Sequence, residues 1–210
     1  MKPFDPLEYK NLGESIVRAM NEQPIHSLDN LEKFEGAGIY ALYYTGDFLA
    51  YSPISRANKQ SPGSVPIYIG KAEAENARKG GSVDDVIGND YKGTKLFSRV
   101  MKHKQSIEKV SNLDVKDFHV RVLVVTPTWI PLAETIAIRN SRPLWNVVID
   151  GLGNHDPGKG RYSGMRPIWD TLHPGRPWAD KLKPRPETPE FFEQKIQAYL
   201  TALITSRPQE

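Results

Sequence analysis

Two short segments rich in aromatic and β-branched residues constrain the fold of this chain more than any other feature. The first is GIYALYYT at 38–45, and the second is PIYIGKA at 66–72. Such residues favour strands, and the Gly46-Asp47 pair after the first segment is a typical turn. A third segment, 118–125, is apolar on both faces towards its end, which is typical of a central strand. The sequence therefore predicts a small sheet of three strands.

Segments whose apolar residues recur at helical spacing lie before, between and after these predicted strands. Thr94 stands before a stripe that runs to Val110, and Thr188 followed by Pro189 is typical of a helix start. We therefore predict helices at 7–20, 94–110, 131–140 and from 188 towards the C-terminus. The fold class that follows is α+β, with a small central antiparallel or mixed three-stranded sheet flanked by helices.

The 210 residues give an expectation of about one domain, although composition divides the chain into three parts. Residues 1–35 are predicted to form an acidic N-terminal helical arm, residues 36–148 the core, and residues 149–210 a basic, loop-rich extension that ends in a helix. Within the core we predict an insertion loop at 46–65 and mostly loop or short helix at 73–93. We expect the three parts to form one compact domain.

Composition excludes several classes of protein. The chain has no cysteine, which excludes disulfides, thiolate zinc sites and a cysteine nucleophile. Its longest uncharged stretch in the apolar middle, 122–133, has 12 residues, whereas a membrane helix needs about 20. The first ten residues lack the apolar region of a signal peptide. We expect a soluble intracellular protein with no membrane contact.

Charge is unevenly distributed along the chain. The net charge is only +3, but residues 94–109 carry five basic residues and one acid, and residues 159–185 carry seven basic residues and two acids. Such blocks can line a surface that binds phosphates, or they can be ordinary solvated faces.

Arg99 and His103 are four residues apart and so project from one side of the predicted helix. We expect the apolar stripe to lie mainly on the other side. A guanidinium can contact two phosphate oxygens, and an imidazole one turn away can relay a proton near neutral pH. The pair suits a scissile phosphate, and the alternative is a basic surface helix.

Glu134 is a second candidate, because it sits at helical spacing among apolar residues. A carboxylate on an apolar face needs a cation, either Mg²⁺ or a basic side chain such as Arg99 or Arg142. Tyrosines cluster in the first two predicted strands, but a phenol is a poor base unless a cation or metal lowers its pKa.

Gly38-Ile39-Tyr40 and Tyr68-Ile69-Gly70 resemble the name-giving motif of the GIY-YIG nuclease superfamily. An arginine on a helix, a glutamate on a later helix and a following asparagine complete the pattern in order, here as Arg99, Glu134 and Asn146. The two tyrosines of the motif are 28 residues apart, more than is usual in the family. We interpret the extra residues, 46–65, as an added DNA-contacting loop.

A closer resemblance covers nearly the whole chain. The pieces GAGIYALYYTG, PIYIGKA, SNLD, PLWN, DGLGNHDPGKGR and HPGRPWA are similar to the type II restriction endonucleases of this superfamily, in the subgroup that cuts CCGCGG. The resemblance implies a prokaryotic, cytoplasmic enzyme that hydrolyses double-stranded DNA at a short palindrome. It further implies a homodimer, one Mg²⁺ or Mn²⁺ per active site, and a cognate DNA methyltransferase in the same system.

The resemblance also implies roles for single residues. Tyr40 would activate the attacking water, directly or with His103 as the proton acceptor. Tyr68 would hold the nucleophile or the phosphate, and Arg99 would neutralise the charge that builds on phosphorus.

The remaining implied roles concern the metal. Glu134 would hold it on the leaving 3′ oxygen, and Asn146 would orient that carboxylate or contact the DNA backbone. Lys71 would help to lower the pKa of a neighbouring tyrosine.

Base recognition is expected from the 46–65 loop and from the basic loop of the extension, through Asn154, His155, Lys159, Arg161 and Arg166.

Other interpretations stay open at this point. Asp114-Val115-Lys116 has the spacing of a different restriction-enzyme core, and His155-Asp156 could bind a metal. The same fold could also belong to a nicking DNA repair or homing endonuclease, or to a DNA-binding module without catalysis. The N-terminal arm and the C-terminal helix are both candidates for the dimer contact.

Overall fold

A four-stranded antiparallel sheet forms the centre of the computed structural model, which describes residues 8–73 and 93–205. The sheet order is β1-β4-β2-β3, and the strands are β1 (His26–Ser27), β2 (Gly38–Tyr44), β3 (Pro66–Ala72) and β4 (Phe118–Val124). The three predicted strands are present. The prediction missed β1, because a two-residue strand has no side-chain pattern and is defined only by its backbone pairing with β4.

Strand β2 is buried along its whole length, since it pairs with β3 on one side and with β4 on the other. Its side chains alternate between two separate apolar clusters, as the pleat of a strand requires. Tyr40, Leu42 and Tyr44 belong to one cluster, and Ile39, Ala41 and Tyr43 to the other. Both faces of the sheet are therefore covered.

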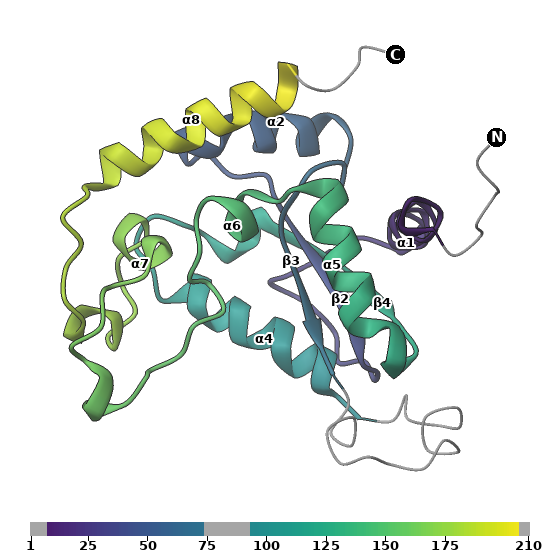
Figure 1. The fold of residues 1–210 in the computed structure, drawn as a ribbon, viewed down its shortest axis with the longest axis horizontal. Coiled ribbons are helices and arrows are strands. Elements are labelled where there is room, and N and C mark those ends of the chain that lie inside the picture. The colour runs from purple at the N-terminus through teal and green to yellow at the C-terminus, as the bar shows by residue number, and fades with distance from the viewer. Residues whose placement is uncertain (1–7, 74–92, 206–210) are drawn as a thin grey trace.

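Helices lie on the two faces of the sheet (Figure 1). They are α1 (Tyr9–Glu22), α2 (Ser52–Gln60), α4 (Lys95–Glu108), α5 (Ile130–Ser141), α6 (Leu144–Val147), α7 (Ile168–Leu172) and α8 (Pro189–Thr205). Buried residues of α1 and α5 join Ile39 in one cluster, whereas those of α4, α6, α7 and α8 join Tyr40 in the other. The result is a three-layer α+β fold, and its class agrees with the prediction.

The predicted insertion loop at 46–65 is largely helical, so this part of the prediction was wrong. It forms the 3₁₀ helix η1 (Leu49–Tyr51) followed by α2, with Pro53 in the first turn, where a proline costs no hydrogen bond. Asn58 is buried, donates to the carbonyls of Tyr44 and Val65, and accepts from the Val65 N–H. These bonds hold α2 against the end of β2. The predicted loop or short helix at 73–93 lies outside the described residues except at its two ends.

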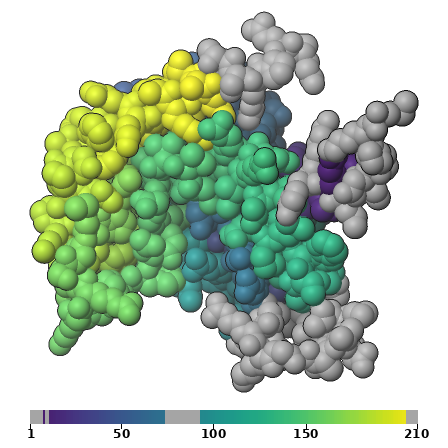
Figure 2. Space-filling model, in the orientation of Figure 1, coloured from purple at the N-terminus to yellow at the C-terminus, as the bar shows by residue number. Residues whose placement is uncertain are grey.

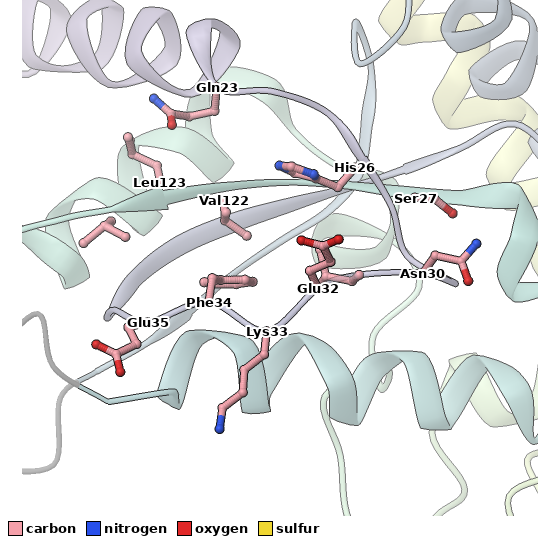
Figure 3. A pocket seen from close by; sticks show the side chains of 12 residues that line it. Gln23, His26, Ser27, Asn30, Glu32, Lys33, Phe34, Glu35, Val122 and Leu123 are labelled. Carbon is pink, nitrogen blue, oxygen red and sulfur yellow. The ribbon is translucent and has the colours of Figure 1, made fainter.

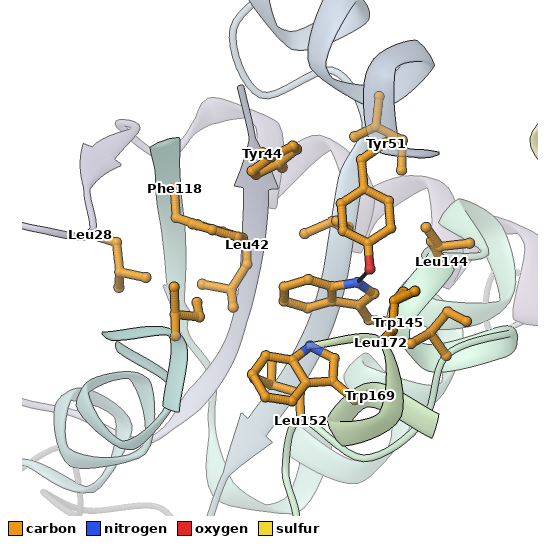
Figure 4. Packing of buried hydrophobic residues seen from close by; sticks show 14 of the residues in the cluster. Leu28, Leu42, Tyr44, Tyr51, Phe118, Leu144, Trp145, Leu152, Trp169 and Leu172 are labelled. Carbon is orange, nitrogen blue, oxygen red and sulfur yellow. Dashed lines mark hydrogen bonds between the residues drawn. The ribbon is translucent and has the colours of Figure 1, made fainter. Parts of the chain in front are cut away.

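The extension beyond residue 149 packs onto the core. Its last helix begins as predicted, since Thr188 Oγ1 accepts from the Phe191 N–H at 3.4 Å. Thr94 stands at the N-cap of α4 but makes no side-chain cap bond. Buried residues of α7 and α8 join the Tyr40 cluster, and Figure 4 shows Trp169 and Leu172 beside Trp145 and Leu144. In Figure 2 the extension and α5 flank an opening in which blue atoms, from the part of the chain that includes β3, are visible.

Buried polar side chains join the extension to the core through a chain of hydrogen bonds. The Trp145 indole donates to Tyr51 Oη at 2.9 Å, as Figure 4 shows, and Tyr51 Oη lies 2.6 Å from His173 Nε2. His173 Nδ1 lies 2.9 Å from Asn112 Oδ1. Burial lowers the pKa of His173 to about 3, so its ring is neutral. Its Nδ1–H therefore donates to Asn112, while Nε2 accepts from Tyr51.

Tyr51→Phe tests this chain of bonds. The variant leaves a buried indole N–H and a buried imidazole nitrogen without their partner, so we expect the free energy of unfolding to fall by about 1–3 kcal/mol. The control is Tyr199→Phe, which removes an exposed hydroxyl that donates to the Arg142 carbonyl. Urea unfolding followed by tryptophan fluorescence measures both variants. Equal losses for the two variants would contradict the assigned roles.

Candidate active site

Tyr40 and His103 form the centre of the site. Tyr40 comes from the middle of β2 and is fully buried, and its hydroxyl lies 2.5 Å from His103 Nε2. His103 continues the buried stripe of Leu96, Val100 and Ile107 along α4 and is itself only 1% exposed. The expectation that the apolar stripe avoids this histidine was therefore wrong. Arg99, one turn earlier, is only half-buried, because it lies at the rim of the same stripe.

Burial keeps both members of this pair uncharged. It lowers the pKa of His103 to about 3, and the positive charge of Arg99 acts in the same direction. Burial raises the pKa of Tyr40 well above its ordinary value, and the nearby Tyr68 adds to this, whereas Arg99 opposes it. At neutral pH the Tyr40 phenol therefore donates its hydroxyl proton to a neutral imidazole. Of the cations expected to lower the tyrosine pKa, Arg99 acts on Tyr40 in that direction, but burial outweighs it.

Tyr68 lies against this pair from the edge strand β3. Its ring centroid is 6.1 Å from that of Tyr40 and 5.2 Å from that of His103. Gly70 leaves room for the Tyr40 side chain beside β3. A Cβ on Gly70 would collide with the Tyr40 hydroxyl and lie 2.7 Å from Tyr40 Cζ. Burial raises the pKa of Tyr68, Arg99 lowers it and Glu134 raises it, so charges of both signs act on this phenol.

Glu134 is paired with a lysine rather than with the arginines considered from the sequence. Its Oε2 lies 3.2 Å from Lys71 Nζ, and Glu73 Oε1 lies 3.1 Å from the same nitrogen. Burial acts to lower the pKa of Lys71, but hydrogen bonds to Glu73 and Glu134 raise it overall. Sequence reasoning missed Glu73, although its spacing of two from Lys71 is the signal for a shared side of a strand.

Asn146 holds the outer edge of β3. Its amide accepts from the Ile69 N–H and donates to the Ile69 carbonyl, both at 2.8 Å. It thereby supplies the backbone pairing that an edge strand lacks on its open side. The structure uses this side chain for the backbone of the Tyr-Ile-Gly motif rather than for the Glu134 carboxylate. Sequence spacing alone gave no signal for this pairing.

The residues predicted to contact DNA lie in different surroundings: one is at the site, three are exposed and one is paired inside the extension. His155 Nε2 lies 3.2 Å from Arg99 Nη1, which brings this loop residue to the site. Lys159 and Arg161 are exposed in the 3₁₀ helix η4 (Lys159–Arg161). Arg166 donates to the Ala179 carbonyl at 3.1 Å and pairs with Asp180 at 3.4 Å, so its guanidinium has partners inside the extension. Asn154 is exposed at the start of the loop.

The two alternative metal sites receive no support from the structure. Asp114 caps the 3₁₀ helix η2 (Val115–Asp117) by accepting from the Lys116 N–H. Asp156 accepts from the Gly158 N–H and from Tyr162, while its neighbour His155 contacts Arg99. Within residues 8–73 and 93–205 no group of three or more histidines and carboxylates is arranged to hold a metal.

The donor set at Lys71 nevertheless fits Mg²⁺. Glu134 and Glu73 present carboxylate oxygens to one cation, the lysine ammonium, and both are partly exposed. Mg²⁺ in proteins commonly takes one or two carboxylates and completes its shell with water and substrate phosphates. The chemistry of this site therefore matches the expected cofactor.

A separate pocket of about 680 Å³ lies at the opposite edge of the sheet, between β4 and the segment before β2 (Figure 3). Its lining includes His26, Phe34 and Val122 and none of the predicted site residues.

No helix in the described part of the chain is long and apolar enough to cross a membrane.

A central strand with Gly-Ile-Tyr, an edge strand with Tyr-Ile-Gly and an arginine-bearing helix against both define a nuclease of the GIY-YIG fold. A family model, the Eco29kI GIY-YIG domain, matches residues 32–200, which is most of the 210-residue chain. The chain belongs to this family of restriction endonucleases, for which DNA is the implied substrate. No curated protein matches the chain.

The buried neutral histidines predict an acid-dependent loss of stability. His103 and His173 take up a proton only near pH 3 in the folded protein but near 6.5 when unfolded, so the unfolded state binds protons more readily between these values. Their effect is absent above pH 7. At pH 5 each lowers the free energy of unfolding by about 2 kcal/mol. Urea unfolding between pH 4.5 and 7.5 measures the slope, which His103→Gln should reduce. An unchanged slope in that variant would contradict the burial of a neutral imidazole.

Proposed function

We propose that this chain is a Mg²⁺- or Mn²⁺-dependent type II restriction endonuclease that hydrolyses DNA at a short palindromic site. The observation that carries this proposal is the 2.5 Å contact between Tyr40 and His103 beside Arg99, in a chain of a restriction endonuclease family. A neutral phenol bonded to a neutral imidazole is an acid–base pair along which a proton can pass.

Water activation would use this pair as a relay. As the water attacks phosphorus, its proton passes to Tyr40 Oη, while the phenolic proton passes to His103 Nε2. His103 would be the final acceptor, because its Nε2 accepts the hydrogen bond of the Tyr40 hydroxyl in the resting protein. The negative phosphate favours the resulting imidazolium and so opposes burial and the Arg99 charge, which both lower the pKa of His103.

Arg99 and Tyr68 would bind the scissile phosphate. Arg99 lies at the rim of the site with its guanidinium beside His155, and the ring of Tyr68, which carries a hydroxyl, lies next to the Tyr40 ring. Fixed donors aimed at the equatorial oxygens stabilise the charge that builds in the transition state. Asn146 acts indirectly in this proposal, by fixing the strand that carries Tyr68.

Glu134 would hold the metal, and Glu73 offers a second carboxylate. Bound there, Mg²⁺ would stabilise the charge on the leaving 3′ oxygen. Lys71 keeps the two carboxylates together from the open edge of the sheet.

Recognition and assembly follow from a palindromic target. One active site per chain and two strands to cut require a two-fold homodimer, with one protomer per strand. Lys159 and Arg161 are exposed basic residues of the extension and suit contact with DNA. The resemblance to enzymes of that specificity makes CCGCGG the first target to test. A restriction enzyme of this kind further implies a cognate methyltransferase that protects the host DNA.

The decisive experiment is digestion of plasmid and phage DNA with Mg²⁺, with EDTA as the control. Discrete fragments are expected, and their ends give the target. Nicked circles would favour a repair or homing nuclease, and specific binding without cleavage would favour a DNA-binding module. Cleavage that persists in EDTA would contradict the metal requirement.

Glu134→Gln tests the metal ligand. The variant should lose Mg²⁺-dependent cleavage by at least about a hundredfold and keep specific DNA binding in Ca²⁺, because only the charge that holds the metal is removed. Its matched control is Glu14→Gln, a change of an exposed glutamate on α1. Cleavage assays and gel-shift titrations compare them. Wild-type cleavage by Glu134→Gln would remove this residue from the proposal.

Tyr40→Phe tests the relay. Removing the hydroxyl breaks the path from water to His103, so cleavage should fall by about 10²- to 10⁴-fold. Tyr43→Phe is the control, since it removes a buried hydroxyl from the same strand on the opposite face of the sheet. Single-turnover cleavage rates and thermal melting measure both. If Tyr40→Phe cut DNA at the wild-type rate, the relay would be wrong.

A further inference from the structure

Arg176 is a buried arginine whose hydrogen bonds are all directed to one loop and one carboxylate. Its side chain is 2% exposed, and its Nε and Nη2 donate to Asp170 at 2.6 and 2.5 Å. Nη1 donates to the carbonyls of Leu152 and Asn154 at 3.0 and 3.2 Å, and Nη2 also donates to that of Gly151 at 2.9 Å. A guanidinium has five N–H donors, and these acceptors use every one.

The contacts of Arg176 fix the conformation of its surroundings more than they add to the free energy of unfolding. Its guanidinium lies 4.6 Å from the ring centroid of Trp169 and 4.7 Å from that of Trp178. A buried ion pair adds little net stability, because desolvation offsets the attraction of the charges. Three of the five hydrogen bonds nevertheless end on successive parts of one loop backbone. The pair therefore determines the conformation of residues 151–154.

The loop that Arg176 holds lies against the active site. A Cβ on Gly153 would sit 3.2 Å from Arg99 Nη2 and 3.5 Å from Tyr68 Oη, so the backbone passes directly over both side chains. Two residues further along, His155 Nε2 lies 3.2 Å from Arg99 Nη1. The loop thus places an imidazole against the Arg99 guanidinium, which in the proposed function binds the scissile phosphate.

The contact with Arg99 fixes the tautomer of His155. Partial desolvation of the ring lowers the pKa of His155, and the nearby Arg99, Lys102 and Arg176 act in the same direction, so the ring is neutral at neutral pH. A guanidinium only donates, so Nε2 accepts from Arg99 and the ring proton sits on Nδ1. His155 is exposed, and its Nδ1–H is a donor suited to an anionic oxygen.

We propose that His155 is a further catalytic residue, which orients Arg99 and donates from Nδ1 to the scissile phosphate, and that Asp170 and Arg176 are positioning residues that hold its loop over the site. This inference rests on the proposed nuclease function. It differs from a role in base recognition, because the partner of His155 is the arginine of the catalytic helix and the loop lies on Tyr68.

The test measures single-turnover cleavage in Mg²⁺ and DNA affinity in Ca²⁺ for His155→Ala, His155→Gln and the wild type. We expect His155→Ala to cleave DNA on the order of 10²-fold more slowly with unchanged DNA affinity. Loss of one hydrogen-bond donor to the transition state has an effect of this size. His155→Gln keeps an acceptor and a donor, so it should recover part of the rate. His26→Ala is the matched control, an exposed histidine on β1 at the far edge of the sheet.

A double-mutant cycle separates action through Arg99 from an independent effect. In an Arg99→Lys background, His155→Ala should cost less than in the wild type, because its contact with the guanidinium is already lost. Equal costs in both backgrounds would overturn the proposed pairing. A loss of affinity with an unchanged cleavage rate would identify a base- or backbone-binding residue instead and would also overturn the proposal.

Arg176→Lys tests the positioning pair, because a lysine keeps the charge but cannot reach five acceptors. We expect it to slow cleavage at temperatures where circular dichroism shows a folded protein, and to add nothing to the effect of His155→Ala. Additive losses would mean a purely structural role. If wild-type protein fails to cut any DNA, the proposed function itself fails. If wild type cuts and His155→Ala cuts equally fast, only the present inference fails.

Discussion

The hydrogen bond between Tyr40 and His103 is the interaction on which the rest of the structure depends. It joins the central strand to α4 beside a buried apolar cluster, and both partners are uncharged there. A charged group at the same place would be costly to bury, so the site keeps its charges, Arg99, Glu134 and Lys71, at the partly exposed edge beside β3. Proton transfer can therefore take place in the interior, next to a rim that suits an anion.

The extension completes this arrangement from the opposite side of the opening. The Arg176 guanidinium, paired with Asp170, lies beside the rings of Trp169 and Trp178. It donates to three backbone carbonyls of the loop that leads to His155. A second buried chain, from Trp145 through Tyr51 and His173, joins the same extension to the core. Segments far from the Gly-Ile-Tyr motif in sequence therefore determine what its arginine contacts.

Prediction from sequence worked where local pattern decides structure. Alternating and helical spacing located the three longer strands and α4, α5 and α8. The roles that the ordered motif implies for Tyr40, Tyr68, Arg99 and Glu134 stay predictions. Prediction from sequence was wrong at 46–65, where α2 forms because Asn58 finds backbone partners on β2 and before β3. It also placed His103 on the polar side of its helix, since spacing alone does not show that a buried tyrosine will accept a histidine beside it.

The sequence by itself determined the fold class and the family, because strand periodicity, helix periodicity and the order of a few motif residues are properties of the chain. Only the tertiary structure decided the partners: Lys71 for Glu134, the backbone of Ile69 for Asn146, and His155 for Arg99. The reason is physical. Each of these contacts joins elements that are distant in sequence, and its strength depends on burial and on distances that exist only after the elements have packed together.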